Sequence, residues 1–136
     1  MTNLEFKNVR FHQRFENYQK SLKQLTEGLQ IESPSKIEEV GLIKIFELTF
    51  ELAWKTLKDY LESEGVEAKF PREVIKAGVA SEILLNGDVW LEMLEGRNLL
   101  SHVYNQNQAE SILKLINKTY ILELILLENI FLTKLN

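Results

Sequence analysis

Arg97, His102 and Tyr104 bring three groups with complementary chemistry into eight residues of the chain. Arg97 is a permanent cation whose planar guanidinium can bind a phosphate through two parallel hydrogen bonds. His102 can exchange a proton with a ribose 2′-hydroxyl or a leaving group near neutral pH, and Tyr104 could position either group. The trio therefore suggests nucleotide or RNA binding, or phosphodiester cleavage that needs no metal ion.

The spacing of the trio limits the backbone that can bring these side chains together. Each residue of an α-helix turns by about 100°, so Arg97 and Tyr104 share one face, whereas His102 points about 140° away from Arg97. The three side chains converge only if a helix ends near Ser101 or His102 and the backbone turns there.

A structural interpretation of the same residues stays open. His102 could lie near a helix C-terminus, Tyr104 could be half-buried, and Arg97 could pair with Glu92 or Glu95 on its own helix. In that case the residues would cap a helix and would bind no ligand.

A second polar group lies on a long predicted helix, where Glu47, Glu51 and Lys55 recur every four residues beside Trp54. This line could be a solvated face with one Glu–Lys pair, or it could be a charged wall that lines a cleft or an interface. Under the second interpretation, the residues expected to line the cleft beside the trio are Glu47, Glu51, Trp54, Lys55, Asn98 and Ser101.

Helices must position these residues, because apolar residues recur at steps of three and four and no segment alternates as a strand does. The expected helices cover residues 5–29, 35–63, 72–85, 89–101 and 109–132. We predict an all-α fold with a single domain over residues 1–136. Its architecture would be an antiparallel up-and-down four-helix bundle, with the third position split into two shorter helices.

Individual residues predict where several helices begin and end. Ser35 and Glu38 match a capping box, and Gly65 is a C-terminal stop. Pro71 suits the first position of a helix, and Asp88 can cap the helix that follows it.

The last predicted helix has an unusual distribution of apolar residues. Its first half carries one apolar stripe, but the segment from Tyr120 to Leu132 is apolar on nearly every side. A helix that is apolar all round must be covered all round. We therefore predict an oligomer, most simply a two-fold homodimer formed through this helix. The stripe in the first half comprises Ile112, Leu115, Ile116, Thr119 and Leu122.

Composition limits the remaining possibilities. The chain has 20 acidic and 16 basic residues, for a net charge of −4, which argues against a broad surface for duplex nucleic acid. It has two histidines and no cysteine, so we expect no metal site, and we find no motif that calls for a cofactor. No segment suits a signal peptide or a membrane span, so we expect a cytoplasmic protein without membrane contact.

The chain resembles a known family in several of its segments. Arg97-x4-His102-x-Tyr104 matches the Arg, four to six residues, His, any residue, Tyr signature of the HEPN superfamily. Within that superfamily the chain is most similar to the nucleotidyltransferase substrate-binding proteins, which are relatives of HepT-type toxins. The similarity also covers residues 46–55 (FELTFELAWK), 71–75 (PREVI), 90–94 (WLEML), 97–98 and 101–104.

This resemblance implies a helical homodimer that acts beside a minimal nucleotidyltransferase and binds a nucleotide or RNA as its substrate-binding subunit. In HepT-like members the bundle is a metal-independent endoribonuclease toxin, which the transferase neutralises by adenylylating the motif tyrosine, here Tyr104. The substrate-binding role is our leading hypothesis, and an active endoribonuclease that uses Arg97, His102 and Tyr104 is the second. A third is a bundle without ligand chemistry.

Overall fold

The computed structural model describes the backbone of residues 3–100 and 106–135, and all of its regular elements are helical. No strand occurs in these two ranges. The all-helical fold is therefore confirmed. The up-and-down order of the helices in a four-helix bundle stays a prediction. The elements are α1 (Asn3–Gly28), α2 (Lys36–Ser63), α3 (Pro71–Ala80), α4 (Gly87–Leu100), α5 (Gln106–Leu115), the π-helical turn η1 (Ile116–Tyr120) and α6 (Ile121–Leu135).

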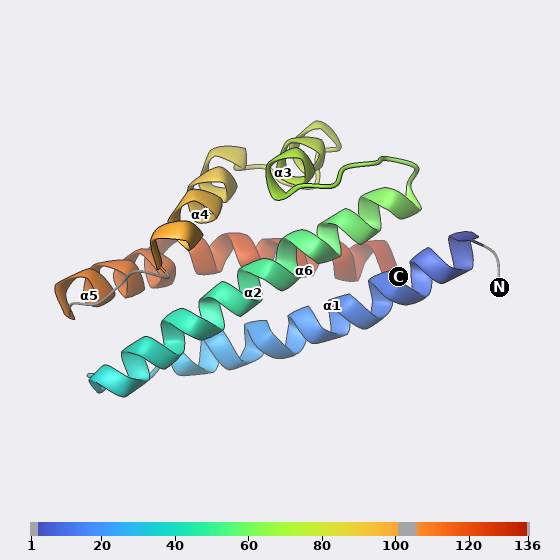
Figure 1. Cartoon of the computed structure of the whole chain (residues 1–136). Helices are drawn as coiled ribbons and strands as arrows, with labels where there is room; N and C mark the ends of the chain where they lie inside the picture. The colour runs from blue at the N-terminus through green and yellow to red at the C-terminus, as the bar shows by residue number, and fades with distance from the viewer. Residues whose placement is uncertain (1–2, 101–105, 136) are drawn as a thin grey trace.

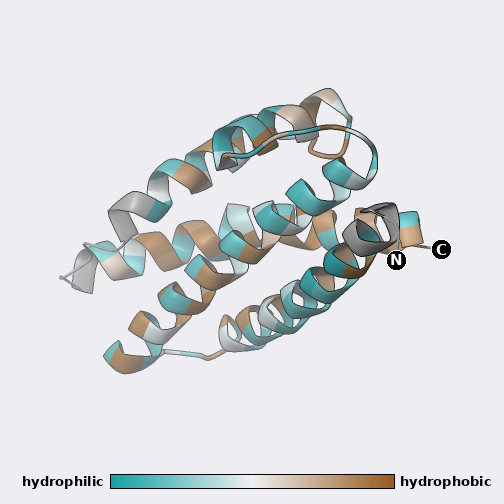
Figure 2. Ribbon diagram, turned by 45° about the vertical axis from the view of Figure 1, so that its right-hand side comes forward, coloured by the Kyte–Doolittle hydropathy of each residue, from teal (hydrophilic) through white to brown (hydrophobic). Residues whose placement is uncertain are grey.

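The two longest helices, α1 and α2, run antiparallel and pack along much of their length (Figure 1). Apolar residues at steps of three and four along α1, from Phe11 to Leu25, are buried, and the Phe11 and Phe15 rings lie 5.3 and 5.5 Å from the ring of Phe131 on α6. These edge-to-face contacts join α1 to α6 in one core. Apolar and polar residues alternate around the helices as this packing requires (Figure 2).

Three predicted helix boundaries are confirmed. The Ser35 hydroxyl accepts a hydrogen bond from the Glu38 amide at 3.1 Å, and the Glu38 carboxylate accepts one from the Ser35 amide at 2.9 Å. Pro71 is the first residue of α3. Gly65 follows α2 with a φ of 83°, which favours a residue without a Cβ.

The third predicted helix extends too far, because α3 ends at Ala80 and not near residue 85. Beyond α3, Glu82 has a φ of 61°, and the amides of Ile83 and Leu84 both donate to the Gly78 carbonyl. Ile83 and Leu84 are buried by this turn, so their apolar character does not signal a longer helix.

The predicted Asp88 cap is also wrong. Helix α4 begins at Gly87, so Asp88 lies inside its first turn. The Asn86 carbonyl accepts the Val89 amide at 3.0 Å, and the Asn86 side chain donates to the carboxylate of Glu123 on α6. Residue 86 therefore starts the helix and also joins it to α6.

The last predicted helix is longer than expected and contains the wide turn η1. A π turn holds one residue more than an α turn, so it shifts the phase of every residue after it. As a result the stripe predicted for this helix does not continue as one buried face: Leu122, its last member, is 57% exposed, whereas Tyr120 is buried.

The two sides of α6 are both apolar, as the sequence indicates. Leu124, Leu127 and Phe131 are buried in the core. The opposite side carries exposed leucines, namely Leu122, Leu126 and Leu132.

None of the described helices combines the length and the apolar character that crossing a bilayer requires.

Candidate functional site

Arg97 lies in the last turn of α4 and forms an ion pair with Glu51 on α2. The two side chains are 28% and 29% exposed, so the pair is only partly open to solvent. Packing between Trp90 and Phe50, whose ring centroids are 6.1 Å apart, holds the two helices together beneath it. The fold therefore presents a guanidinium in a fixed place beside α2.

The local pairing considered for Arg97 is wrong. Glu92 accepts a hydrogen bond from the Tyr120 hydroxyl, and Glu95 lies 3.8 Å from Arg72 on α3. Arg97 instead contacts a residue that is 46 positions away in the sequence.

Glu51 contacts three other residues that were predicted to line the cleft or to form the site. Its carboxylate accepts a hydrogen bond from the Trp54 indole at 3.0 Å and lies 3.9 Å from the Lys55 ammonium. The Lys55 nitrogen also lies 5.8 Å from the centroid of the Trp54 ring. The structure thus brings together Arg97, Glu51, Trp54 and Lys55.

Glu47, one helical turn before Glu51, carries a buried oxygen atom with an unmet hydrogen bond. Its Oε2 lies 3.3 Å from the Lys44 ammonium, while Oε1 is buried and has no hydrogen-bond partner in the described part of the chain. An unsatisfied buried oxygen costs free energy, so a donor from a ligand would stabilise this arrangement.

The other predicted site residues cannot be placed. Ser101, His102 and Tyr104 lie outside the described residues, and the side chain of Asn98 does as well. The convergence of Arg97, His102 and Tyr104 therefore stays a prediction.

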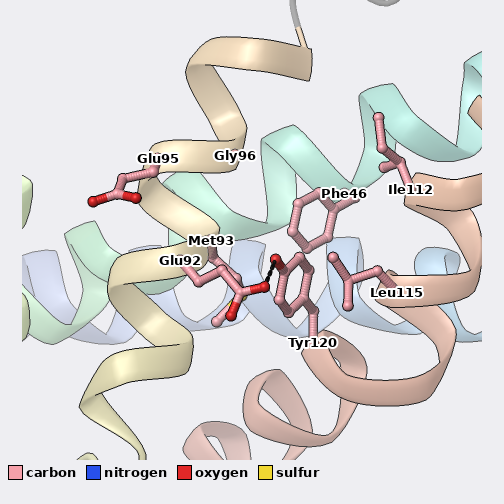
Figure 3. A pocket seen from close by; sticks show the side chains of 8 residues that line it. All are labelled: Phe46, Glu92, Met93, Glu95, Gly96, Ile112, Leu115 and Tyr120. Atoms are coloured by element: carbon pink, nitrogen blue, oxygen red, sulfur yellow. Dashed lines mark hydrogen bonds between the residues drawn. The ribbon is translucent and has the colours of Figure 1, made fainter. Parts of the chain in front are cut away.

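A cavity of about 300 Å³ opens between α4 and α5, with α2 and η1 forming the rest of its wall (Figure 3). The sequence does not predict this cavity, because its lining residues come from α2, from α4 and from the consecutive elements α5 and η1. They are Phe46, Glu92, Met93, Glu95, Gly96, Ile112, Leu115 and Tyr120.

The polar groups of the cavity form one pair, in which the Tyr120 hydroxyl donates to the Glu92 carboxylate at 2.9 Å. Burial, followed by the hydrogen bond and charge of Glu92, raises the pKa of Tyr120, so the phenol stays protonated and acts as a donor. The ring of Tyr120 also stacks on that of Phe46, with centroids 5.6 Å apart. The only sequence signal for this pair is that Tyr120 lies out of phase with the predicted stripe of the last helix.

No group of three or more histidine, aspartate or glutamate side chains is arranged to hold a metal ion among the described residues.

Comparison with known proteins gives two findings. Residues 13–131 match the family model described as "nucleotidyltransferase substrate binding protein like". A crystal structure of a protein from Thermus thermophilus shares 32% sequence identity and superposes with a TM-score of 0.73, covering 84% of this chain and 95% of that one. No curated protein matches the chain.

Proposed function

The chain belongs to the nucleotidyltransferase substrate binding protein like family, and on that basis we propose that it is the substrate-binding partner of a minimal nucleotidyltransferase. Its ligand in this proposal is a nucleotide or an RNA, bound where Arg97, His102 and Tyr104 converge. Arg97 binds a phosphate, His102 exchanges a proton with a ribose hydroxyl, and Tyr104 positions the ligand.

The observation that carries the proposal is the Arg97–Glu51 pair. A guanidinium held by one carboxylate keeps further N–H donors for a phosphate, since it has five in all. The Glu47 carboxylate, one turn before Glu51 on the same face of α2, adds an acceptor for a hydroxyl or an amine of the same ligand. Guanidinium and carboxylate side by side suit a ligand that has both phosphate and hydroxyl groups.

Two measurements test this proposal. Purified chain and a minimal nucleotidyltransferase from the same organism should elute as one complex in size-exclusion chromatography. The chain should also bind adenosine monophosphate or a short RNA in calorimetry, and Arg97→Ala should weaken that binding at least tenfold, whereas Arg97→Lys should retain part of it. Absence of both the complex and the binding would contradict the proposal.

Self-association through α6 is part of the proposal. The exposed leucines Leu122, Leu126 and Leu132 offer an apolar surface that a second copy can cover. An isologous contact of this kind would place two copies of the site in one assembly.

Metal-independent endoribonuclease activity is the second candidate, and the Arg97-x4-His102-x-Tyr104 motif favours it. The purified chain would then cleave RNA in the presence of a chelator, and His102→Ala would abolish cleavage. In that case adenylylation by the transferase would add mass to Tyr104, and Tyr104→Phe would escape it. Intact RNA after incubation with the wild-type chain would exclude this candidate and leave the binding role in place.

A further inference from the structure

The cavity between α4 and α5 is separate from the contacts of Arg97 with Glu51. We propose that this cavity binds a nucleotide base with an exocyclic amino group, such as adenine, and that the Glu92 carboxylate accepts a hydrogen bond from that amino group. The inference rests on the proposed function, because it assigns a place to the base of the nucleotide that the protein binds.

The size and the walls of the cavity suit a single flat ring. Small-molecule sites usually measure about 300–1,000 Å³, so a cavity of about 300 Å³ holds one base and not a dinucleotide. Met93 on α4 and Ile112 on α5 supply apolar wall, and the stacked rings of Phe46 and Tyr120 also line the cavity. Gly96 leaves the α4 side open, since a Cβ placed there would meet nothing within 4 Å.

The polar groups determine which end of a nucleotide fits. The Glu92 side chain points toward Tyr120, whereas Glu95 points away from the cavity (Figure 3). No lysine, arginine or histidine is among the described lining residues. An ionised carboxylate only accepts hydrogen bonds, so it attracts an amino group and repels a phosphate. The base therefore enters, and the phosphate stays outside.

The position of Arg97 agrees with this orientation. Arg97 lies four residues after the lining residue Met93, so the two side chains fall on nearly one face of α4, and its partner Glu51 lies on α2, which also supplies Phe46. The cavity and the guanidinium thus share the same two helices. The phosphate, which is joined to the base through the ribose, would then lie outside the cavity next to a residue that binds phosphate well.

Titration by nuclear magnetic resonance tests the inference, with adenosine and purine riboside as ligands. Purine riboside lacks only the 6-amino group, so it should bind about tenfold more weakly than adenosine. Adenosine should shift the aromatic signals of Tyr120 and the amide signal of Gly96. Gly96→Leu and, separately, Leu115→Trp should fill the cavity and abolish these shifts.

A matched control exists on α2. Gly41 also lies within a helix, and a Cβ added to it would meet nothing within 4 Å. Because Gly41 lies outside the cavity lining, Gly41→Leu should bind adenosine like the wild type. Equal binding of adenosine by wild type, Gly96→Leu and Leu115→Trp would overturn the inference, and so would the absence of any shift in the wild type.

The experiment also separates this inference from the proposed function. If Arg97→Ala weakens binding of adenosine monophosphate and Gly96→Leu does not, the cavity inference fails and the proposed function stands. If adenosine binds in the cavity but no complex forms with the transferase and Arg97→Ala binds the nucleotide normally, the proposed function fails and the cavity inference stands.

Discussion

Glu51 shows how one carboxylate can organise a site without being its reactive group. It contacts the Arg97 guanidinium, the Trp54 indole and the Lys55 ammonium, which come from two helices. Removing Glu51 therefore removes several contacts at once, whereas removing Arg97 removes only one of them. This difference can be measured.

We expect Arg97→Ala to lower the free energy of unfolding by about 1 kcal/mol, as for a partly exposed ion pair. Glu51→Ala should cost more, about 2 kcal/mol, because it also leaves the indole N–H of Trp54 without its acceptor. Urea unfolding of both single variants and of the double variant gives the coupling energy. A coupling energy near zero would show that the pair does not form in solution.

Glu128 on α6 provides a test of pH dependence. Burial raises the pKa of its carboxyl group, so the folded protein holds the proton more tightly than the unfolded chain does. The stability from this group is complete below the unfolded pKa of about 4.3 and is lost as the pH rises through the folded pKa.

Glu128→Gln should therefore be more stable than the wild type at about pH 7, because it removes the cost of a partly buried charge. The difference should shrink as the pH falls toward about 4, where wild-type Glu128 takes up its proton. Urea midpoints measured across this range provide the check. A difference that stays constant with pH would contradict the expected role of burial.

At the scale of the helix, local signals were reliable wherever neighbouring residues alone determine the geometry. The capping box at the start of α2 is such a case, because Ser35 and Glu38 satisfy each other's amides. Ser35→Ala should lower the free energy of unfolding by about 1 kcal/mol. Glu38→Gln is the control, since glutamine also completes a capping box and should leave the midpoint nearly unchanged. An equal loss of unfolding free energy in Ser35→Ala and Glu38→Gln would indicate that the capping hydrogen bonds are not what stabilises the start of α2.

Local signals failed where a distant contact decides the conformation. The loop after α3 turns because the amides of Ile83 and Leu84 donate hydrogen bonds to the Gly78 carbonyl. The apolar character of these two residues indicates burial, but it does not show whether a turn or a helix buries them. Arg97 has Glu92 and Glu95 nearby on its own helix, yet it pairs with Glu51 on another. The residue types of the site could therefore be predicted from the sequence, but their partners could not.

The cavity could not be predicted for the same reason. Phe46 and Met93 fit the ordinary pattern of core residues, and the hydrogen bond from Tyr120 to Glu92 joins residues 28 positions apart. No short-range motif contains this pair. Only the arrangement of α2, α4, α5 and η1 in space reveals the cavity.

At the scale of the whole molecule, the outer side of α6 determines the expected assembly. We expect a dimer at micromolar concentration, since Leu122 and Leu126 are 57% and 44% exposed on a helix whose other side already fills the core. Leu126→Lys should give a monomer that still unfolds cooperatively, because this side chain contributes little to the core. Multi-angle light scattering measures both masses, and a monomeric wild type would contradict the expectation.

The wide turn η1 can also be read as a one-residue insertion in a regular helix. Deleting Lys118, an exposed residue of this turn, should restore α-helical hydrogen bonding and rotate α5 against α6 by about 100°. The α6 core would keep its place, whereas Ile112 and Leu115 would leave the cavity wall. We expect a variant that melts cooperatively but no longer binds adenosine. Loss of a single codon would then remove the ligand site and leave the fold in place, so the two could evolve independently.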